Sequence, residues 1–448
     1  MSILIKNGLI VTMDRDNRIL SGSVLIRDNE IREVENIEEG DFDTVIDAEG
    51  KIVMPGLVCA YARPYQILLR AAPLKVEPPS DFVQILQRIW WPMDESLTNE
   101  DTYNSTLAAC MEFIKTGITF FGGSYSSQSS ISKSLDNAAS AIEESGLRAF
   151  IGFEASERNT RAEGARGMRE NIRFLESRQK KTFKETRVRG MVGLSASFTV
   201  SEELLRHGKR VANRFDVPIV ISAAEGEVGP YHNLEKFGNR TMERFRDIGV
   251  LSSNTVLGHC VHVNRDELSI IEKTGAKVAH TPMSDMLNAT GVAPVLEMRE
   301  RGIQVGLGND GYFFDGFENI RSLFLLHKLL SRDPRRISPK EALKMATIEG
   351  ARLYGIENKI GSIEPGKRAD IILIDSSSTP TPVSRENVMD YIVSTVRSSD
   401  VKTVIVDGDI VMEDRNIKTL DEKRAIKRSK KTAKKVWKNL NMKRGENY

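Results

Sequence analysis

The chain contains little cysteine: Cys59, Cys110 and Cys260 are three residues in 448. None has a second cysteine at a short spacing, so neither a disulfide framework nor a zinc knuckle is expected. No apolar run approaches the roughly 20 residues that a membrane-spanning helix needs. The N-terminus lacks a basic region followed by an apolar core, so we expect no signal peptide, and a reducing cytoplasm is the expected location.

The sequence also lacks a low-complexity linker and any fixed-period repeat other than an alternation of strands and helices. Its 448 residues exceed one ordinary domain. A barrel of about 250 residues with a second unit would account for them. An apolar content of 40% and a charged content of 28% are typical of a soluble globular protein.

Strand-like runs alternate with amphipathic helical stretches from Val53 onward. Seven apolar runs follow the first one, at residues 117–121, 148–153, 189–194, 217–221, 255–259, 276–280 and 303–308. Eight such units in about 300 residues predict an α/β fold, the (β/α)8 TIM barrel. Active sites of that fold lie at the carboxyl ends of the strands, so the residues there matter most.

The first of these strands lies within residues 53–63, an apolar run that passes through Pro55 and Gly56. Alternate residues share a face of a strand, so Cys59, Tyr61 and Arg63 should point the same way. This stretch resembles the first barrel strand of the amidohydrolase superfamily, in its adenosine and S-adenosylhomocysteine deaminase and aminotriazine chlorohydrolase branch. The likeness covers nearly the whole chain and is also carried by residues 221–225, 258–262, 279–284, 308–311 and 360–375.

The resemblance implies a small, discontinuous β-sandwich domain beside the barrel, because this superfamily builds that domain from both chain ends. We expect the sandwich to comprise residues 1–55 plus 356–415, and the barrel residues 56–355. Residues 416–448 remain as a basic C-terminal helix or tail.

The resemblance also implies hydrolysis at a C–N or C–Cl bond of a flat nitrogen heterocycle. In the family a divalent metal such as zinc, held by three imidazoles and a carboxylate, lowers the pKa of a bound water. Here Tyr61 and Arg63 stand at the two histidine positions of the first strand. Ser222 stands at the histidine position of the fifth strand, and Asp310 matches the metal carboxylate.

The other predicted site residues follow from the same resemblance. Glu225 matches the carboxylate that transfers protons, and His259 matches the imidazole that polarises the attacking water. With Asp310 they form the predicted catalytic set. The residues predicted to line the pocket or contact a ligand are Tyr61, Arg63, Ser222 and His280.

The substituted residues are poor metal ligands. Tyrosine and serine ligate weakly at neutral pH, and arginine stays protonated without a free lone pair. We therefore expect no zinc-dependent hydrolysis and no bound cofactor. Arg63 is expected to supply the missing positive charge and to pair with Asp310, Glu225 or both. A structural interpretation stays open, in which these carboxylates only neutralise Arg63, and His259 and His280 are hydrogen-bonded pocket residues.

Three functional hypotheses remain at this point. The first is metal-free binding of a purine-like or similar small heterocycle, with weak or altered catalysis. The second is a non-catalytic scaffold or a partner of an active paralogue. The third is an active deaminase or chlorohydrolase with a rebuilt metal site made of Asp310, Glu225, His259 and His280. The sequence leaves the oligomeric state open, and a homo-oligomer is one option.

The charge of the chain is concentrated at its C-terminus. Residues 421–448 contain eleven Lys and Arg against three Asp and Glu, a net of +8, which leaves −6 for the other 420 residues. A helix over 426–440 would carry an apolar face of Ile426, Ala433, Trp437 and Leu440. That face favours a solvated helix packed on the barrel. Binding of nucleic acid or an anionic membrane through the basic face is the alternative, although no nucleic-acid-binding motif accompanies it.

Overall fold

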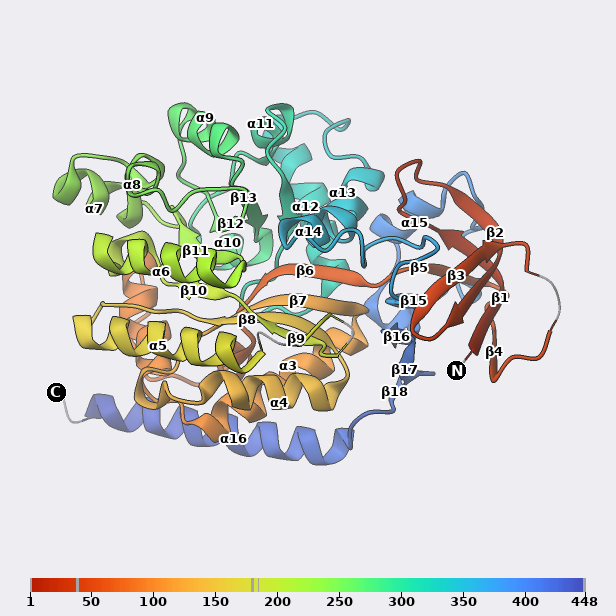
Figure 1. The fold of residues 1–448 in the computed structure, drawn as a ribbon, viewed down its shortest axis with the longest axis horizontal. Helices are drawn as coiled ribbons and strands as arrows, with labels where there is room; N and C mark the ends of the chain where they lie inside the picture. Colours follow the sequence, from red (N-terminus) through yellow and green to blue (C-terminus); the bar gives the residue numbers. More distant parts are fainter. Residues whose placement is uncertain (1, 38–39, 179–180, 184, 446–448) are drawn as a thin grey trace.

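The computed structural model describes residues 2–37, 40–178, 181–183 and 185–445. Two sheets of parallel strands form the barrel that was predicted, one of four strands and one of five. The strands are β6 (Leu57–Ala62), β7 (Ile118–Tyr125), β8 (Arg148–Phe153), β9 (Val188–Gly190), β10 (Val192–Leu194), β11 (Ile219–Ala223), β12 (Thr255–His259), β13 (Lys277–His280) and β14 (Val305–Leu307). The strand predicted at residues 189–194 is divided at Met191 into β9 and β10, which accounts for nine strands in place of eight. The prediction of a (β/α)8 fold is confirmed (Figure 1).

Two short β-bridges close the barrel, one joining Ala62 to Asp310 and one joining Ala155 to Leu194. At the first bridge, the backbone amide of Arg63 also donates to the carbonyl of Asp310 at 2.8 Å. The ends of the first and last strands are therefore held together by backbone hydrogen bonds, and the side chains of Arg63 and Asp310 emerge beside each other.

Helices surround the barrel and continue beyond it. Those after the barrel strands are α3 (Asn99–Lys115), α4 (Ser134–Ser145), α5 (Arg161–Arg178), α6 (Glu202–Phe215), α7 (Val228–Phe237), α8 (Thr241–Ile248), α9 (Arg265–Thr274), α10 (Pro282–Leu287), α11 (Val295–Glu300) and α12 (Gly316–Ser331). Further along are α13 (Pro339–Met345), α14 (Ile348–Leu353), α15 (Val388–Ser394) and α16 (Glu422–Gly445). The connection after β6 carries η1 (Pro64–Leu69), α1 (Phe82–Ile85), η2 (Leu86–Trp90) and α2 (Trp91–Asp94), and single turns are η3 (Gln128–Ser130), η4 (Ser197–Thr199) and η5 (Ser398–Asp400).

Local sequence explains where many of these helices begin and end. The side chain of Asn264 accepts a hydrogen bond from the amide of Glu267 in a capping box at the start of α9, and Gly275 ends that helix in a left-handed conformation. Ser338 and Glu341 form the same box at the start of α13, next to Pro339.

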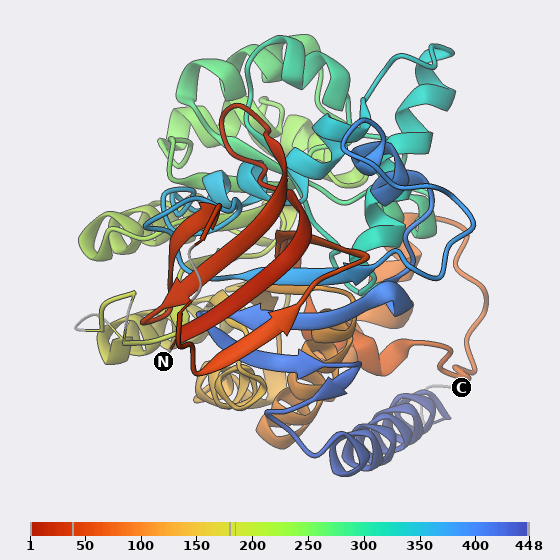
Figure 2. The same cartoon turned by 90° about the vertical axis from the view of Figure 1, so that its right-hand side faces the viewer.

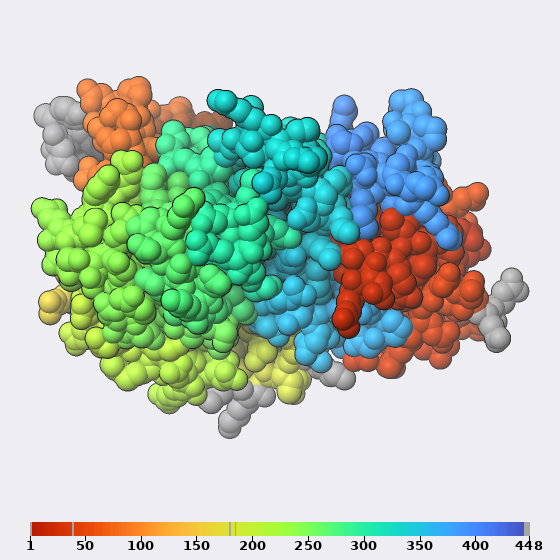
Figure 3. All heavy atoms as spheres, turned by 90° about the horizontal axis from the view of Figure 1, so that it is seen from above, coloured from red at the N-terminus to blue at the C-terminus, as the bar shows by residue number. Residues whose placement is uncertain are grey.

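A separate nine-stranded sheet contains strands from both ends of the chain. Its members are β1 (Ser2–Val11), β2 (Ile19–Arg27), β3 (Glu30–Glu35), β4 (Thr44–Asp47), β5 (Lys51–Pro55), β15 (Ile371–Asp375), β16 (Val401–Val406), β17 (Asp409–Glu413) and β18 (Asn416–Ile417). Strand β5 joins the two groups, since it pairs with β1 on one side and with β15 on the other. Red N-terminal and blue C-terminal segments consequently lie side by side at one end of the molecule (Figures 2 and 3).

The expected alternation along β6 is wrong at its end. Cys59 packs in the large core cluster, whereas Tyr61 packs in a second cluster with Val58 and Ala60. The register against β7 shifts between Cys59 and Ala62, so the strict two-residue period fails there. The side chains of Cys59 and Tyr61 therefore pack in different core clusters and do not point the same way. Burial raises the pKa of the Cys59 thiol to about 12, so the thiol stays protonated.

The basic C-terminal segment forms helix α16, which runs along one edge of the molecule and packs against α3 (Figure 1). The indole nitrogen of Trp437 donates to the carbonyl of Leu68 at 2.6 Å. The expected packing on the barrel is therefore present, but one predicted contact residue is wrong: Ile426 is 40% exposed, and Ala425 and Val436 are buried instead. Within the described ranges, no helix is both long and apolar enough to cross a membrane.

Candidate active site

A cavity of about 670 Å³, including its open mouth, lies at the carboxyl ends of the barrel strands. The segment after β6 forms much of its apolar wall, with the contributing side chains Phe82, Leu86, Trp90 and Trp91. Arg63, Ser222, Glu225 and Asp310 line the opposite, polar part. Four of the seven predicted site residues therefore face the cavity, and the other three, Tyr61, His259 and His280, are buried behind its lining.

Arg63 is the centre of the polar wall. Its Nη1 lies 2.5 Å from Oδ1 of Asp310, and its Nε donates to Oε1 of Glu154 at 2.9 Å. Its Nη2 donates to Oγ of Ser222 at 2.7 Å. The guanidinium thus has two carboxylates and a hydroxyl around it, with only 11% of the side chain exposed. A buried cation needs such pairing to offset its desolvation.

Part of the predicted pairing is present. Asp310 contacts Arg63 as expected. The second carboxylate on Arg63 is Glu154, whereas Glu225 makes no ion pair with Arg63 among the described residues. Sequence reasoning missed Glu154, although it directly follows β8 and occupies a strand end, the position that the fold marks as functional.

Tyr61 and Ser222 make further contacts with the Arg63 guanidinium and with each other. The phenol oxygen of Tyr61 lies 2.8 Å from Oγ of Ser222 and 3.4 Å from Oε1 of Glu154. Cζ of Arg63 lies 5.1 Å from the centre of the Tyr61 ring, within the range of a cation–π contact. Burial raises the pKa of Tyr61 well above its usual value, so the phenol is a hydrogen-bond donor here.

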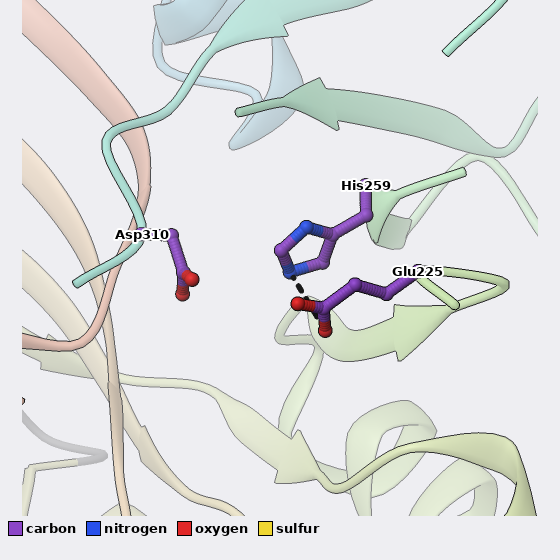
Figure 4. Close-up of side chains that lie close together, drawn as sticks. All are labelled: Glu225, His259 and Asp310. Carbon is purple, nitrogen blue, oxygen red and sulfur yellow. Dashed lines mark ion pairs between the residues drawn. The ribbon is translucent and has the colours of Figure 1, made fainter. Parts of the chain in front are cut away.

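His259 connects the cavity to a buried carboxylate. Its Nε2 lies 3.4 Å from Oε2 of Glu225 (Figure 4). Its Nδ1 lies 2.9 Å from Oδ1 of Asp285. Burial opposes the charged imidazolium, but the carboxylates of Glu225 and Asp285 outweigh it and raise the pKa of His259 to about 9. Burial also raises the pKa of Glu225. The pair can therefore hold and exchange a proton near neutral pH.

Asp310 is held from two sides and has an unusual backbone. Ser284 donates to its Oδ2 at 2.7 Å, while Arg63 occupies its Oδ1. Burial opposes ionisation of this carboxyl group, but the neighbouring Arg63 guanidinium holds its pKa below the ordinary value. Both Asp310 and His259 adopt left-handed φ angles, 55° and 69°. Such strain costs on the order of 1–3 kcal/mol and gathers at functional sites.

His280 lies further from the cavity than predicted. Its Nε2 is 3.2 Å from Nε2 of His327 on α12, and its Nδ1 is 4.0 Å from Oδ2 of Asp285. Burial lowers its pKa well below the usual value, so it is neutral. It lies behind the cavity lining, whereas Asp285 directly contacts His259.

A second buried ion pair lines the cavity on the aromatic side. Nη1 of Arg158 lies 2.8 Å from Oδ2 of Asp94, and the guanidinium lies over the ring of Trp91. Burial raises the pKa of Asp94 to about 6. Sequence reasoning missed both charged residues. The aromatic wall and the paired charges suit a flat ligand with polar substituents.

Residues 52–411 match the model of the amidohydrolase family, and the chain belongs to that family. A 5'-deoxyadenosine deaminase from Methanosarcina mazei is 34% identical over 439 residues, covering 96% of this chain and 97% of that protein. A 5-methylthioadenosine/S-adenosylhomocysteine deaminase from Syntrophomonas wolfei is 33% identical, with coverage of 97% and 99%.

Two solved structures show the same fold. An adenosine deaminase from Xanthomonas campestris with bound zinc has a TM-score of 0.88 at 20% identity, covering 97% of this chain and 98% of that one. The atrazine chlorohydrolase of Arthrobacter aurescens, complexed with zinc, has a TM-score of 0.84 at 21% identity, covering 96% of this chain and 100% of that one. The family match and the deaminase relatives confirm the recognition of the superfamily from sequence.

A divalent metal is the group that this family implies, and three side chains here could offer it ligand atoms. The atoms belong to Glu225, His259 and Asp310 and lie within 4.8 Å of one another (Figure 4). However, both oxygens of Asp310 are already engaged, by Arg63 and Ser284. A metal would also lie beside a permanently charged guanidinium. As arranged, the site does not fit a metal at Asp310 unless Arg63 leaves that carboxylate.

Proposed function

We propose that this chain binds an adenosine-like nucleoside in the barrel cavity, and that Arg63 supplies there the positive charge that a divalent metal supplies in the family. One observation carries the proposal: the guanidinium contacts Asp310, Glu154 and Ser222 at once. The relatives that are 5'-deoxyadenosine and 5-methylthioadenosine/S-adenosylhomocysteine deaminases favour a nucleoside as the ligand. The aromatic wall supplies surfaces for stacking against a purine.

The surrounding charges support this assignment of Arg63. Glu154 and Asp310 are both nearly buried, with side chains 8% and 4% exposed. Two buried carboxylates so close together need a cation between them. Arg63 meets that need with a group that is always charged and that forms directed hydrogen bonds, whereas a zinc ion would require several neutral imidazoles in the same place.

The remaining chemistry is proton transfer. Glu225 lines the cavity and lies against His259, so the pair can donate a proton to a ring nitrogen of a bound heterocycle or accept one from it. Without an ion to acidify water, this pair alone provides a weak route to hydrolysis. We therefore expect binding with slow or altered turnover, and not a fast deaminase.

A second candidate function is metal-dependent hydrolytic deamination. It is favoured by Nε2 of His259, which is buried and has no hydrogen-bond partner among the described residues, and which lies in the three-donor cluster. This candidate requires the contact between Arg63 and Asp310 to open.

Thermal unfolding with added nucleosides tests the proposal. Purified protein is heated with adenosine, 5'-deoxyadenosine or 5-methylthioadenosine, after treatment with a chelator and again after addition of zinc. A ligand at about 100 times its dissociation constant stabilises the folded chain by about 2.7 kcal/mol. We expect the same stabilisation with and without the chelator.

Ammonia release in the same samples separates the two candidates. The proposal predicts little release, unaffected by zinc, whereas release that disappears with the chelator and returns with zinc supports the metal-dependent candidate. Failure of all three nucleosides to stabilise the chain would overturn the binding proposal. The conservative variant Trp91→Phe makes the stacking wall smaller and keeps an aromatic ring next to Arg158, so it should weaken binding without changing metal content.

A further inference from the structure

Helix α16 presents a continuous band of positive charge. Nine of its lysines and arginines are exposed: Lys423, Arg424, Lys427, Arg428, Lys430, Lys431, Lys434, Lys435 and Lys438. The helix spans 24 residues, about 36 Å at 1.5 Å per residue. It lies along an outer edge of the molecule in both ribbon views (Figures 1 and 2).

Most of these cations have no acidic partner among the residues that the structure describes. Among the nine, only Lys435 forms an ion pair with a carboxylate in the described part of the chain, with Asp101. Surface arginines elsewhere are commonly paired, as Arg336 is with Glu300 and Arg301 is with Glu297. Unpaired like charges on one helix repel each other and cost stability. The band is therefore not explained by the stability of the fold.

The apolar side of α16 is already used inside the molecule. Ala425, Val436 and Leu440 are buried, and Trp437 is hydrogen-bonded to η1. Ile426 and Met442, near opposite ends, are the large hydrophobic residues of the helix that are exposed in its described part. A helix that enters a membrane surface needs a free apolar face, so this geometry disfavours a bilayer as the partner.

We infer that the exposed face of α16 binds the phosphate backbone of a nucleic acid, independently of base sequence. The regularly spaced cations of a 36 Å rod complement a linear array of phosphates. The rest of the chain has a net charge of −6, so contact is confined to this edge. The inference is independent of the nucleoside proposal, because α16 lies outside the cavity lining.

The salt dependence of binding tests this inference. The full chain is titrated into labelled RNA and duplex DNA of about 20 nucleotides at several salt concentrations between about 50 and 200 mM. Each phosphate contact contributes about −0.9 to the slope of log K against log salt for duplex DNA, and about −0.7 for a single strand. We expect binding at low salt that weakens steeply as salt rises.

The informative variant replaces Lys427, Lys430, Lys434 and Lys438 together by glutamine. These residues are exposed and keep the Lys435 pair intact. In this variant the slope of log K against log salt should become shallower by about 3. A matched control replaces four exposed lysines on other elements, Lys236, Lys273, Lys340 and Lys359, and so changes the net charge equally.

An equal loss of nucleic-acid affinity in the α16 variant and the control variant would overturn the inference, because it would show a general charge effect. Absence of binding at the lowest salt would also overturn it. A third contradictory result is tighter binding to phosphatidylserine-containing vesicles than to either nucleic acid, with the same loss in the α16 variant. Circular dichroism of both variants checks that the total helix content is kept, so that a lost interaction is not mistaken for unfolding.

Discussion

At the scale of single residues, Arg63 determines the electrostatics of the cavity. It stands where the superfamily resemblance predicts a histidine, and its partners come from three other strand ends: Glu154 after β8, Ser222 on β11 and Asp310 after β14. The arginine alone would be a costly buried charge. With Glu154 and Asp310 it becomes a compensated group that the barrel can hold.

Replacement of Arg63 by alanine should therefore strongly destabilise the chain. It leaves Glu154 and Asp310 buried and close together without a cation, which costs about 3–5 kcal/mol of unfolding free energy. Chemical denaturation measures the change. The double variant Arg63→Ala with Glu154→Gln should recover part of the loss, because one of the two uncompensated charges is gone. If the loss of unfolding free energy in the double variant equals the sum of the losses in Arg63→Ala and Glu154→Gln, this account is contradicted.

The pH dependence of stability should reflect His259. Its pKa is raised to about 9 in the folded chain, above the ordinary value of 6.5, because Glu225 and Asp285 face it. A raised pKa adds stability that is fully present below about pH 6.5 and is lost as the pH rises through about 9. Unfolding free energy should fall across this window by a few kcal/mol, and His259→Asn should flatten the curve. A profile that rises over the same range contradicts the assigned charge state.

At the scale of elements, the meeting of β6 and β14 positions the site. A Cβ added to Gly308 would lie 2.8 Å from Cβ of Tyr61 and 2.9 Å from its backbone nitrogen and oxygen. Only glycine permits this approach, and the same junction brings Arg63 next to Asp310.

Gly308→Ala should consequently force the two strands apart. Overpacking of this kind costs about 1–3 kcal/mol, and it should weaken nucleoside binding as well because Arg63 moves. Gly229→Ala in α7 is the matched control, since an added Cβ there meets only ordinary contacts at 3.5 Å or more. Equal stability of the two variants in thermal unfolding would count against a tight junction at Gly308.

The elements themselves were largely predictable from sequence, whereas their exact contacts were not. Short apolar runs at regular spacing mark buried parallel strands, so the barrel follows from local pattern. The ion-pair partner of Arg63 does not follow from local pattern, because Glu154 is 91 residues away in the chain and no local signal joins the two residues. The two-residue alternation failed at Tyr61, because pairing with a neighbouring strand set the register there.

The C-terminal helix illustrates the same limit. Its helical period and its basic face were readable, but the buried side was displaced by about one position, from Ile426 to Ala425. The side of a helix that packs inward depends on the surface it meets, here α3 and η1. Likewise, the three donor residues of the site were predictable by resemblance, but the engagement of Asp310 by Ser284 required the structure.

At the scale of the whole molecule, a buried charge cluster joins the barrel to the terminal sheet. Nη2 of Arg148, at the start of β8, lies 2.7 Å from Oδ1 of Asp407, and its Nε lies 3.4 Å from Oδ2 of Asp370. Arg368 lies 2.5 Å from the same Asp407 oxygen. Asp370 and Asp407 adjoin β15 and β16, so the cluster links segments far apart in sequence.

Arg148→Ala should destabilise the whole chain by about 3–5 kcal/mol, since it leaves the buried carboxylate of Asp370 without its cation and removes one of the cations on Asp407. Differential scanning calorimetry measures the effect. Arg161→Ala, at the exposed start of α5, should change stability by no more than about 0.5 kcal/mol. Comparable effects of the two substitutions would argue against a structural role for the cluster.

The metal stoichiometry of the purified protein tests the central claim most directly. Bound metal is removed from the protein with a chelator, and the protein is then exposed to excess zinc and passed through a desalting column. Inductively coupled plasma mass spectrometry measures the zinc that remains bound. Because Arg63 occupies Asp310, we predict far less than one zinc ion per chain. One tightly held zinc ion per chain, lost in Asp310→Asn, would contradict the account and support the metal-dependent candidate.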